Sequence, residues 1–332
     1  MSVVVPAGVR EGVAAALGRS FGTADFRASA VGGGCIAAAA RIEMGTGDVA
    51  FLKWAEPGRA APGMFAAEAA SLKALAAARA VRVPAVLAVS DPPATVGADP
   101  VAAGGGAPEG GGEESARASH RRGDAPGWLL LEWLEPGRPS AGTAERLGGA
   151  LAALHRVRGA GYGWPEDNFI GSLPQPNRPA AEWPAFWRER RLEPQLRRAV
   201  DGGAFDVGDR RRFGRLLDRL DELLAGAGAD GASLLHGDLW SGNVHVMAGG
   251  EAALVDPASY YGHREVDLAM AELFGGFDAA FFHAYREAWP VEPAYAAVRR
   301  PIYQLYYLLV HVNLFGRGYV GSTLAALGAA GV

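Results

Sequence analysis

One short loop constrains this chain more than any other feature. Residues 235–243 read LHGDLWSGN, so Asp238 precedes Asn243 by five positions between apolar segments. In such a loop the aspartate can accept the proton of a hydroxyl group while the asparagine oxygen holds a magnesium ion. Thirteen residues after Asn243, Asp256 ends the apolar run 254–255 and offers a second hard oxygen ligand. The pattern indicates phosphoryl transfer, although aspartate and asparagine also favour turns that have no chemical role.

The N-terminal part supplies the groups that would bind phosphates. Gly32, Gly33 and Gly34 precede a predicted strand, where backbone N–H groups can approach a phosphate closely. Lys53 lies in the strand-like run 49–54, from which it would reach the α- and β-phosphates. Glu68 follows on a predicted helix and is placed to pair with Lys53. The other lysine of the chain, Lys73, is expected to face solvent from the same helix.

Secondary-structure patterns divide the chain into a β-rich part and a helical part. Strands are predicted at 36–43, 49–54, 85–89 and 128–133, and a helix at 64–80. Further helices are predicted at 143–158, 183–200, 207–225, 266–274, 277–289 and 293–315. Five catalytic elements follow one another along these segments: the Gly-rich turn, the strand lysine, the helix glutamate, the Asp238–Asn243 loop and Asp256. Their order predicts an α+β, bilobal protein-kinase-like fold. Residues 1–135 form its nucleotide-binding N-lobe, and residues 136–332 form a C-lobe with the catalytic loop and substrate site.

A compositionally distinct segment interrupts the N-lobe. Between Asp91 and Gly127, 14 of 37 residues are Gly or Pro, and there is no Leu, Ile, Met or aromatic residue. Such a segment buries too little apolar surface to offset its ordering entropy. It is predicted to be a flexible insertion into one folded unit, because strand-like runs flank it on both sides.

Composition excludes several classes of protein. The net charge of −4 is too small to predict a nucleic acid or an anionic membrane as partner. A single cysteine, Cys35, cannot form an internal disulfide, and the first residues do not have the pattern of a signal peptide. The most apolar run, 301–316, contains Gln304, His311 and Asn313, which suits a buried helix. These features predict a cytoplasmic location, and a monomer is compatible with them.

The catalytic loop resembles that of small-molecule kinases more than that of protein kinases. It reads His-Gly-Asp where protein kinases have His-Arg-Asp, and Asp256 is followed by Pro-Ala in place of Phe-Gly. A further helix is predicted about ten residues after Asp256, which leaves no room for an activation segment. The His-Gly-Asp form resembles the aminoglycoside phosphotransferase and choline kinase group.

Within that group the chain resembles the fructosamine kinase (ketosamine 3-kinase) family. The motifs that carry this resemblance are GGGCI at 32–36, LHGDLWSGN at 235–243, YYGHREVDLA at 260–269, NFIGS at 168–172 with QPN at 175–177, and ELFGGF at 272–277. The resemblance covers nearly the whole chain except residues 91–127. It implies ATP- and Mg²⁺-dependent phosphorylation of a ketoamine sugar on its 3-hydroxyl, on small ketoamines or glycated proteins. The phosphate makes the adduct labile, so the amine is regenerated.

The resemblance also assigns roles to particular residues. Asp238 would be the general base, Asn243 and Asp256 the magnesium ligands, and Lys53 with Glu68 the pair that orients ATP. The hinge of a kinase would correspond to Glu132 through Leu134, which would contact adenine through backbone groups.

Four further residues are candidates for supporting roles. Trp240, next to the catalytic base, is predicted to form a wall for the sugar, with packing under the loop as an equal alternative. Asp267 is expected to brace the catalytic loop through backbone N–H groups, and His236 to be a hydrogen-bonded core residue. Cys35 beside the Gly-rich turn is a candidate redox residue, or simply a small apolar side chain.

Two other functions fit the same residues. An aminoglycoside or other small-molecule phosphotransferase shares the loop, but would be expected to have an acidic cluster for a polycationic drug, which the sequence does not display. A pseudokinase that binds nucleotide as an interaction module is the non-enzymatic alternative. The presence of all five catalytic elements argues against it.

Overall fold

The computed structural model describes residues 3–32, 37–55, 61–91 and 126–331. Gly33, Gly34 and Cys35 therefore lie outside the described residues, as does the predicted insertion apart from its ends. The chain forms two compact units. The first comprises residues 1–66 and 87–130, and the second comprises residues 67–86 and 131–332.

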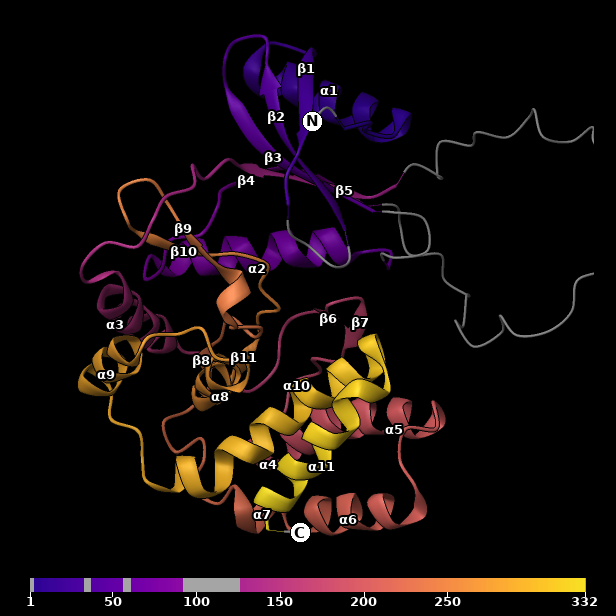
Figure 1. Cartoon of the computed structure of the whole chain (residues 1–332), viewed down its shortest axis with the longest axis vertical. Coiled ribbons are helices and arrows are strands. Elements are labelled where there is room, and N and C mark those ends of the chain that lie inside the picture. The colour runs from indigo at the N-terminus through magenta and orange to yellow at the C-terminus, as the bar shows by residue number, and fades with distance from the viewer. Residues whose placement is uncertain (1–2, 33–36, 56–60, 92–125, 332) are drawn as a thin grey trace, which may run out of the picture. The chain divides into compact units, whose positions relative to one another are not determined.

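A five-stranded sheet covered by one helix forms the first unit. Its strand order is β1 (Phe26–Ala30), β2 (Ala38–Met44), β3 (Val49–Trp54), β5 (Trp128–Glu132) and β4 (Val86–Ser90), as Figure 1 shows. The first three strands pair antiparallel. Helix α1 (Ala7–Phe21) was not predicted from the sequence. It packs Val9, Val13, Ala16 and Leu17 into the core with the inward residues of the strands.

The two ends of the predicted insertion belong to this folded unit. Asp91 accepts a hydrogen bond from the backbone N–H of Ala66 (2.7 Å), in the first turn of helix α2 (Met64–Ala78). A Cβ atom on Gly127 would lie 2.4 Å from the Asp91 carboxylate. The N–H groups in the first turn of a helix have no partner within the helix, and Asp91 accepts from one of them. Gly127 has no side chain and so leaves space for the Asp91 carboxylate.

Helices and short hairpins make up the second unit. Along the chain they are α3 (Thr143–His155), β6 (Asn168–Ile170), β7 (Leu173–Gln175), α4 (Trp183–Phe186), α5 (Glu193–Asp201), α6 (Val207–Asp218), α7 (Leu220–Leu223), β8 (Ser233–Leu234), β9 (Val244–Val246), β10 (Ala252–Leu254), β11 (Tyr261–Gly262), α8 (Glu265–Leu273), α9 (Ala279–Ala288), α10 (Arg300–Phe315) and α11 (Val320–Ala329). The pairs β6–β7, β9–β10 and β8–β11 are antiparallel. Helix α11 and the β6–β7 hairpin were not predicted from the sequence.

Two helices of this unit contain a wider, π-helical turn directly before a proline. These turns are Trp187–Leu192, which leads into α5, and Tyr295–Arg299, which leads into α10. Pro194 and Pro301 follow as the second residue of each new helix. A proline has no N–H group and its ring clashes with the carbonyl four residues earlier. A π turn relieves this conflict because it widens the helix locally. The chain therefore stays helical through each proline, as predicted for 183–200 and 293–315.

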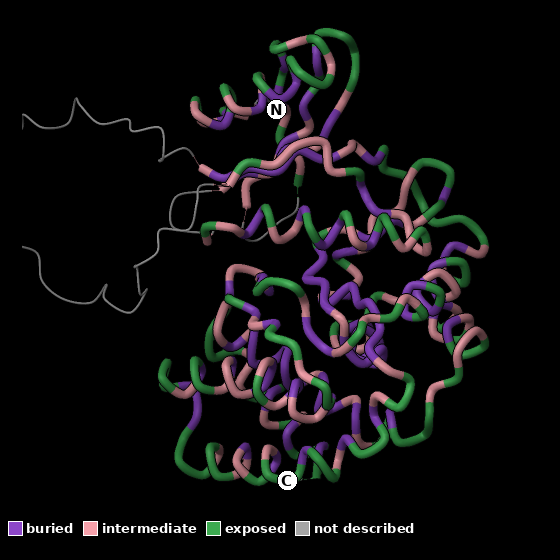
Figure 2. Tube along the Cα trace, turned by 180° about the vertical axis from the view of Figure 1, so that it is seen from behind, coloured by how far each residue is buried: buried purple, intermediate pink, exposed green. Residues whose placement is uncertain are grey.

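Helix α10 is buried on most of its sides. Its buried residues are Pro301, Ile302, Tyr303, Leu305, Tyr306, Tyr307, Leu308, Leu309, Val310 and Val312. Figure 2 shows buried stretches running through the inside of the helical unit and exposed ones along its outer helices. In the part of the chain that the structure describes, no helix has the length and apolar character needed to cross a bilayer.

Helices α3 and α9 pack closely through a glycine (Figure 1). A Cβ atom on Gly148 of α3 would lie 2.2 Å from the carbonyl oxygen of Phe281 in α9. At the next residue, Gly149, an added Cβ would meet nothing within 4 Å. A side chain at Gly148 would therefore disturb the packing of α3 against α9, whereas a side chain at Gly149 would change only the helix propensity of α3.

We predict opposite effects of alanine at these two positions. Gly148→Ala forces two backbones apart and should lower the melting temperature by about 2–6 °C. Gly149→Ala gains helix propensity without a clash and should raise it by about 1–2 °C. Thermal unfolding followed by circular dichroism measures both, and equal effects of the two substitutions would contradict the packing described.

Candidate active site

The three residues predicted for phosphoryl transfer meet in the second unit. The side-chain nitrogen Nδ2 of Asn243 donates to the backbone oxygen of Asp238 (2.9 Å) and to its carboxylate Oδ2 (3.2 Å). It also lies 3.5 Å from the backbone oxygen of Asp256. Strand β9 continues from Asn243, whose carbonyl accepts from the N–H of Val255 (3.0 Å). Because Nδ2 faces Asp238, the carboxamide oxygen of Asn243 is the atom that can face a cation.

The carboxylate of Asp238 has an unusual environment. Burial and the nearby negative charge of Asp256 raise its pKa to about 7, against a lowering effect of the hydrogen bond from Asn243. The residue as a whole is only partly buried. A carboxylate with a pKa near neutrality is a suitable proton acceptor at physiological pH.

The backbone of Asp256 is strained. Its φ of 53° lies in the left-handed region, which a non-glycine residue occupies at a cost of about 1–3 kcal/mol. Such a conformation persists only where the surrounding structure holds it on both sides. Before Asp256, Val255 is tied to Asn243, and after it, the N–H of Ala258 donates to the carbonyl of His236 (3.0 Å).

The structure explains why a glycine stands between His236 and Asp238. Gly237 has a φ of 85°, and a Cβ atom there would lie 2.0 Å from the carbonyl oxygen of Ala258. No other residue fits without moving the backbone after Asp256. Tyr307 of α10 donates its hydroxyl to the carbonyl of Gly237 (2.8 Å), which fixes the loop from a third side. Nothing in the sequence identified Tyr307 as a neighbour of this loop.

Asp267 lies under the catalytic loop and contacts its backbone. Its two carboxylate oxygens accept from the N–H groups of His236 (2.8 Å) and Gly237 (2.9 Å). His155 adds a contact from its Nε2 atom (3.1 Å). Burial by itself raises the pKa of Asp267, but these hydrogen bonds and the nearby histidines outweigh it and lower the pKa. The geometry is that of a brace, which is the role the sequence predicts.

His236 connects the loop to the segment that leads to Asp256. Its ring nitrogen Nε2 lies 2.9 Å from the carbonyl of Val255, and its Nδ1 accepts from the N–H of Asp238 (3.3 Å). Burial lowers the pKa of the imidazole. These partners assign the neutral ring with its proton on Nε2, because a carbonyl can only accept and an N–H can only donate.

Trp240 projects from the loop with 39% of its surface exposed. Its ring covers Gly242, where an added Cβ would lie 2.2 Å from the indole. The side chain is thus fixed on one side and open to solvent on the other. The contact with Gly242 is compatible with packing under the loop, and the exposed part of the ring is compatible with a wall for the sugar. The role as a sugar wall stays a prediction.

The predicted hinge is partly occupied by internal hydrogen bonds. The N–H of Glu132 donates to the carbonyl of Ala85 (2.8 Å), and the carbonyl of Leu134 lies 3.0 Å from Nε2 of His245. The Glu132 carboxylate pairs with Arg82. An adenine ring bound at this hinge would therefore have to use backbone groups other than the Glu132 N–H and the Leu134 carbonyl.

The remaining phosphate-binding candidates belong to different units of the chain. Gly32 is exposed, and Lys53 is half-buried on β3 of the first unit. Glu68 is half-buried on α2, in the portion that belongs to the second unit. Lys73 is exposed, as predicted. The pairing of Lys53 with Glu68 stays a prediction.

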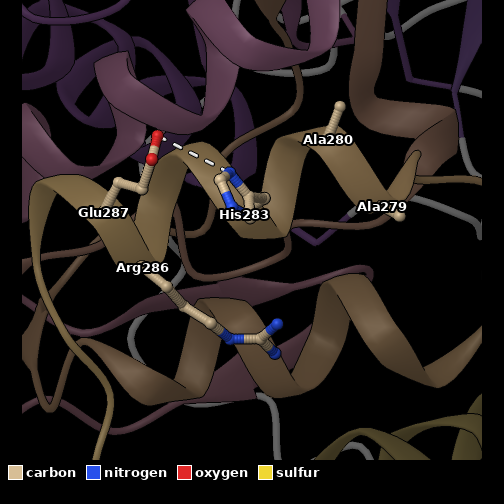
Figure 3. A pocket seen from close by; sticks show the side chains of 5 residues that line it. All are labelled: Ala279, Ala280, His283, Arg286 and Glu287. Atoms are coloured by element: carbon tan, nitrogen blue, oxygen red, sulfur yellow. Dashed lines mark ion pairs between the residues drawn. The ribbon is translucent and has the colours of Figure 1, made fainter.

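The hollows in the described surface do not coincide with these residues. A surface hollow of about 520 Å³ lies along α9, lined by Ala279, Ala280, His283, Arg286 and Glu287 (Figure 3). A second, of about 470 Å³, includes Arg82, Thr143 and Arg146 in its lining. Neither is lined by Asp238, Asn243 or Asp256. The loop 235–243 is the better guide to the active site, since the side chain of Asn243 hydrogen-bonds to the carboxylate of Asp238.

The donor set of this loop suits magnesium. Among the described residues, no group of three or more His, Cys, Asp or Glu side chains could hold a metal ion. Mg²⁺ does not require one, because it is commonly bound by one or two protein oxygens together with water and substrate phosphates. The carboxylate of Asp256 and the amide oxygen of Asn243 are hard oxygen ligands of this kind.

The raised pKa of Asp238 predicts a pH-dependent cost to stability. Between the ordinary aspartate pKa of 3.8 and about 7, the native state retains a proton that the unfolded chain has lost. Stability therefore falls as the pH rises through this window. Asp238→Asn removes the cost, so its melting temperature in EDTA should exceed that of the wild type by about 2 °C or more at pH ~8, and by less at pH ~5.

Asp218→Asn, at an exposed position on α6, serves as the control and should show no such pH-dependent gain. A constant difference between Asp238→Asn and the wild type at both pH values would contradict the raised pKa.

Comparisons with known proteins identify the family of this chain. The fructosamine kinase family model matches residues 9–329. A probable ketoamine kinase of Synechocystis sp. is 40% identical over 263 residues, which is 77% of this chain and 75% of that protein. A chloroplastic protein-ribulosamine 3-kinase of Oryza sativa subsp. indica is 35% identical over 305 residues, covering 90% and 77%.

A solved structure extends the agreement to the fold. The crystal structure of a candidate fructosamine-3-kinase from Thermobifida fusca YX-ER1 superposes with a TM-score of 0.73 at 33% identity, covering 91% of this chain and 92% of that one. The α+β, protein-kinase-like fold predicted from the sequence is thereby confirmed. With a family match over nearly its whole length, this chain belongs to the fructosamine kinase family and is a phosphotransferase of the ketosamine-kinase type.

Proposed function

We propose that this enzyme transfers the γ-phosphoryl group of ATP to the 3-hydroxyl of a ketoamine sugar, and so promotes release of the sugar from its amine. The observation that carries the proposal is the convergence of Asp238, Asn243 and the backbone of Asp256 within hydrogen-bonding distance. Membership of the fructosamine kinase family supports a ketoamine acceptor.

Asp238 receives the proton of the attacking hydroxyl. With a pKa of about 7, its carboxylate is ionised in a large fraction of molecules at neutral pH and can accept that proton. The hydroxyl oxygen then forms a bond to the γ-phosphorus while the bond to the bridging oxygen breaks and ADP leaves. The protein forms no covalent bond to the phosphoryl group in this step. Catalysis therefore comes mainly from positioning the reactants and neutralising the phosphate charge.

Asn243 and Asp256 would hold Mg²⁺, which supplies neutralisation of the phosphate charge when it is bound. The hydrogen bond from Asn243 Nδ2 to Asp238 couples the two functions, since it orients the base and turns the amide oxygen outward. A cation near Asp256 would also reduce the negative charge that raises the pKa of Asp238. The base therefore becomes easier to ionise once the nucleotide complex has formed.

The nucleotide would be held by the groups that the sequence predicts for it. Lys53 and Glu68 form the pair that orients the phosphates, and the turn at Gly32, Gly33 and Gly34 supplies backbone N–H groups. The Glu132 carbonyl and the Leu134 N–H complement the amino group and ring nitrogen of adenine. Each of these assignments follows from the residue's place in the sequence and stays a proposal.

The ketoamine acceptor accounts for the exposed aromatic ring beside the base. Trp240 offers a flat apolar face next to Asp238, which suits the C–H face of a sugar. The phosphate on O3 is bonded through C3, next to the ketone carbon C2. Loss of a proton from C1 gives a C1–C2 enaminol that expels inorganic phosphate from C3, and water then hydrolyses the resulting imine at C1 and releases the amine. A cytoplasmic location fits this role, because both ATP and the amines modified by sugars are abundant there.

An aminoglycoside acceptor is the less favoured alternative. The relatives that cover most of this chain at 35–40% identity have the names of ketoamine and ribulosamine kinases. A pseudokinase is disfavoured by the short contacts among Asp238, Asn243 and Asp256. The name of the rice relative also supports an amine that belongs to a protein.

Product analysis tests the proposed function. We expect the purified protein with Mg²⁺ and ATP to release ADP with ribulosyl-lysine or fructosyl-lysine, and an aminoglycoside panel to give only the background rate. Phosphorus–proton correlation by NMR should couple the new phosphate to the proton on C3. Phosphorylation at another hydroxyl would contradict the O3 assignment, and turnover of aminoglycosides alone would overturn the proposal.

A further inference from the structure

A cluster of buried polar side chains contacts the segment that follows Asp256. It consists of Asn168 and Gln175 of the β6–β7 hairpin with Asn177 and Arg191, all of which are at most 4% exposed. Asn168 and Gln175 are directly opposite each other in the hairpin register. Four polar side chains in a protein interior are costly unless their hydrogen bonds are made, so their retention calls for an explanation.

The cluster makes its hydrogen bonds to the backbone just after Asp256. Asn168 Nδ2 donates to the carbonyl of Ser259 (2.9 Å), and Gln175 Nε2 donates to the carbonyl of Ala258 (3.2 Å). On the other side of the same segment, the N–H of Ala258 donates to His236, and the N–H of Ser259 contacts Ser71 Oγ (3.3 Å). The segment is therefore held from both sides.

Arg191 sets the direction of the whole network. A guanidinium group can only donate, so Asn177 must turn its oxygen toward Arg191 (2.7 Å). The Asn177 nitrogen then faces Asn168 Oδ1 (2.7 Å), which also accepts from Gln175 Nε2 (2.7 Å). Asn168 is thereby left with its nitrogen toward Ser259. A second NH group of Arg191 donates to the carbonyl of Pro176 (2.6 Å), which fixes the guanidinium itself.

From this geometry we infer that Asn168 and Gln175 are positioning residues that hold Asp256 in its strained conformation and thereby set the Mg²⁺ requirement of the enzyme. The left-handed φ of Asp256 needs support after the residue as well as before it, and the two amides provide that support. Neither side chain is placed to touch substrate. The inference rests on the proposed role of Asp256 as a metal ligand, and adds the means by which the ligand is held.

The chain offers a matched control for the hairpin amides. Tyr306 of α10 donates its hydroxyl to Gln175 Oε1 (2.6 Å), on the side of Gln175 that does not contact the Asp256 segment. Tyr306→Phe thus removes a buried hydrogen bond of the same glutamine and leaves its donor to Ala258. A purely structural role of Gln175 would make Tyr306→Phe and Gln175→Met equivalent.

The test measures the Mg²⁺ requirement without relying on turnover. Binding of a fluorescent ATP analogue is titrated with Mg²⁺ for the wild type, Gln175→Met, Tyr306→Phe and, as reference, Asp256→Asn. We expect Gln175→Met to raise the half-saturating Mg²⁺ concentration on the order of tenfold, as is usual for residues that orient metal ligands. Tyr306→Phe should leave it within about twofold, although both substitutions lower the melting temperature.

Asn168→Asp provides a second variant should Gln175→Met fail to fold. It keeps the acceptor for Gln175 and Asn177 but loses the donor to Ser259, and should shift the Mg²⁺ requirement in the same direction. Equal Mg²⁺ requirements of the wild type and the hairpin variants, alongside a lowered melting temperature, would reduce the cluster to packing and overturn the inference.

Failure of the proposed function has a different signature. An unchanged Mg²⁺ requirement in Asp256→Asn would overturn both the metal assignment and the inference. A shift in Gln175→Met and in Asp256→Asn, with no turnover of any ketoamine, would support the inference and contradict only the proposed acceptor.

Discussion

The active site depends on a direct contact between two stretches of backbone. Gly237 of the catalytic loop lies against the carbonyl of Ala258, too close for any side chain, and Ala258 N–H donates back to His236. The loop that carries Asp238, the proposed base, and the segment that follows Asp256, the proposed metal ligand, are thus held as one piece. Asp267 and Tyr307 fix this piece from below through further backbone groups. Substituting the glycine would separate Asp238 from Asp256, whatever else it did.

Two aspartates in this small region have opposite properties because their surroundings differ. Asp267 accepts hydrogen bonds from two N–H groups and a histidine, which lower its pKa and keep it ionised. Asp238 is buried beside another negative charge, which raises its pKa to about 7. The first is suited to hold a backbone in place and the second to exchange a proton. The assignment of roles therefore follows from environment, since the residue type is the same.

Much of the fold and site could be predicted from the sequence. The strand at 49–54 and most helices follow from apolar spacing, and Asp238, Asn243 and Asp256 follow from motif spacing. Helix α1 could also have been found, since Val9, Val13, Ala16 and Leu17 recur at helical intervals. The contact of Tyr307 with Gly237 and that of Gln175 with Ala258 could not be predicted. They join residues that are 70 and 83 positions apart, and no local pattern encodes such pairs. Nor does a sequence show that an aspartate will occupy a left-handed conformation, as Asp256 does.

The central claim is that Asp238, with its raised pKa, accepts the proton of the acceptor hydroxyl. The most direct measurement is the pH dependence of kcat/KM for the ketoamine at saturating Mg²⁺ and ATP, between about pH 5 and pH 9, for the wild type and Asp238→Ala. We predict that the wild-type value rises with pH and levels off below neutrality, since a cation at Asp256 reduces the negative charge that raises the pKa of Asp238. Asp238→Ala should lose turnover while its binding of a fluorescent ATP analogue persists. A flat wild-type profile over this range, or turnover retained in Asp238→Ala, would contradict the account.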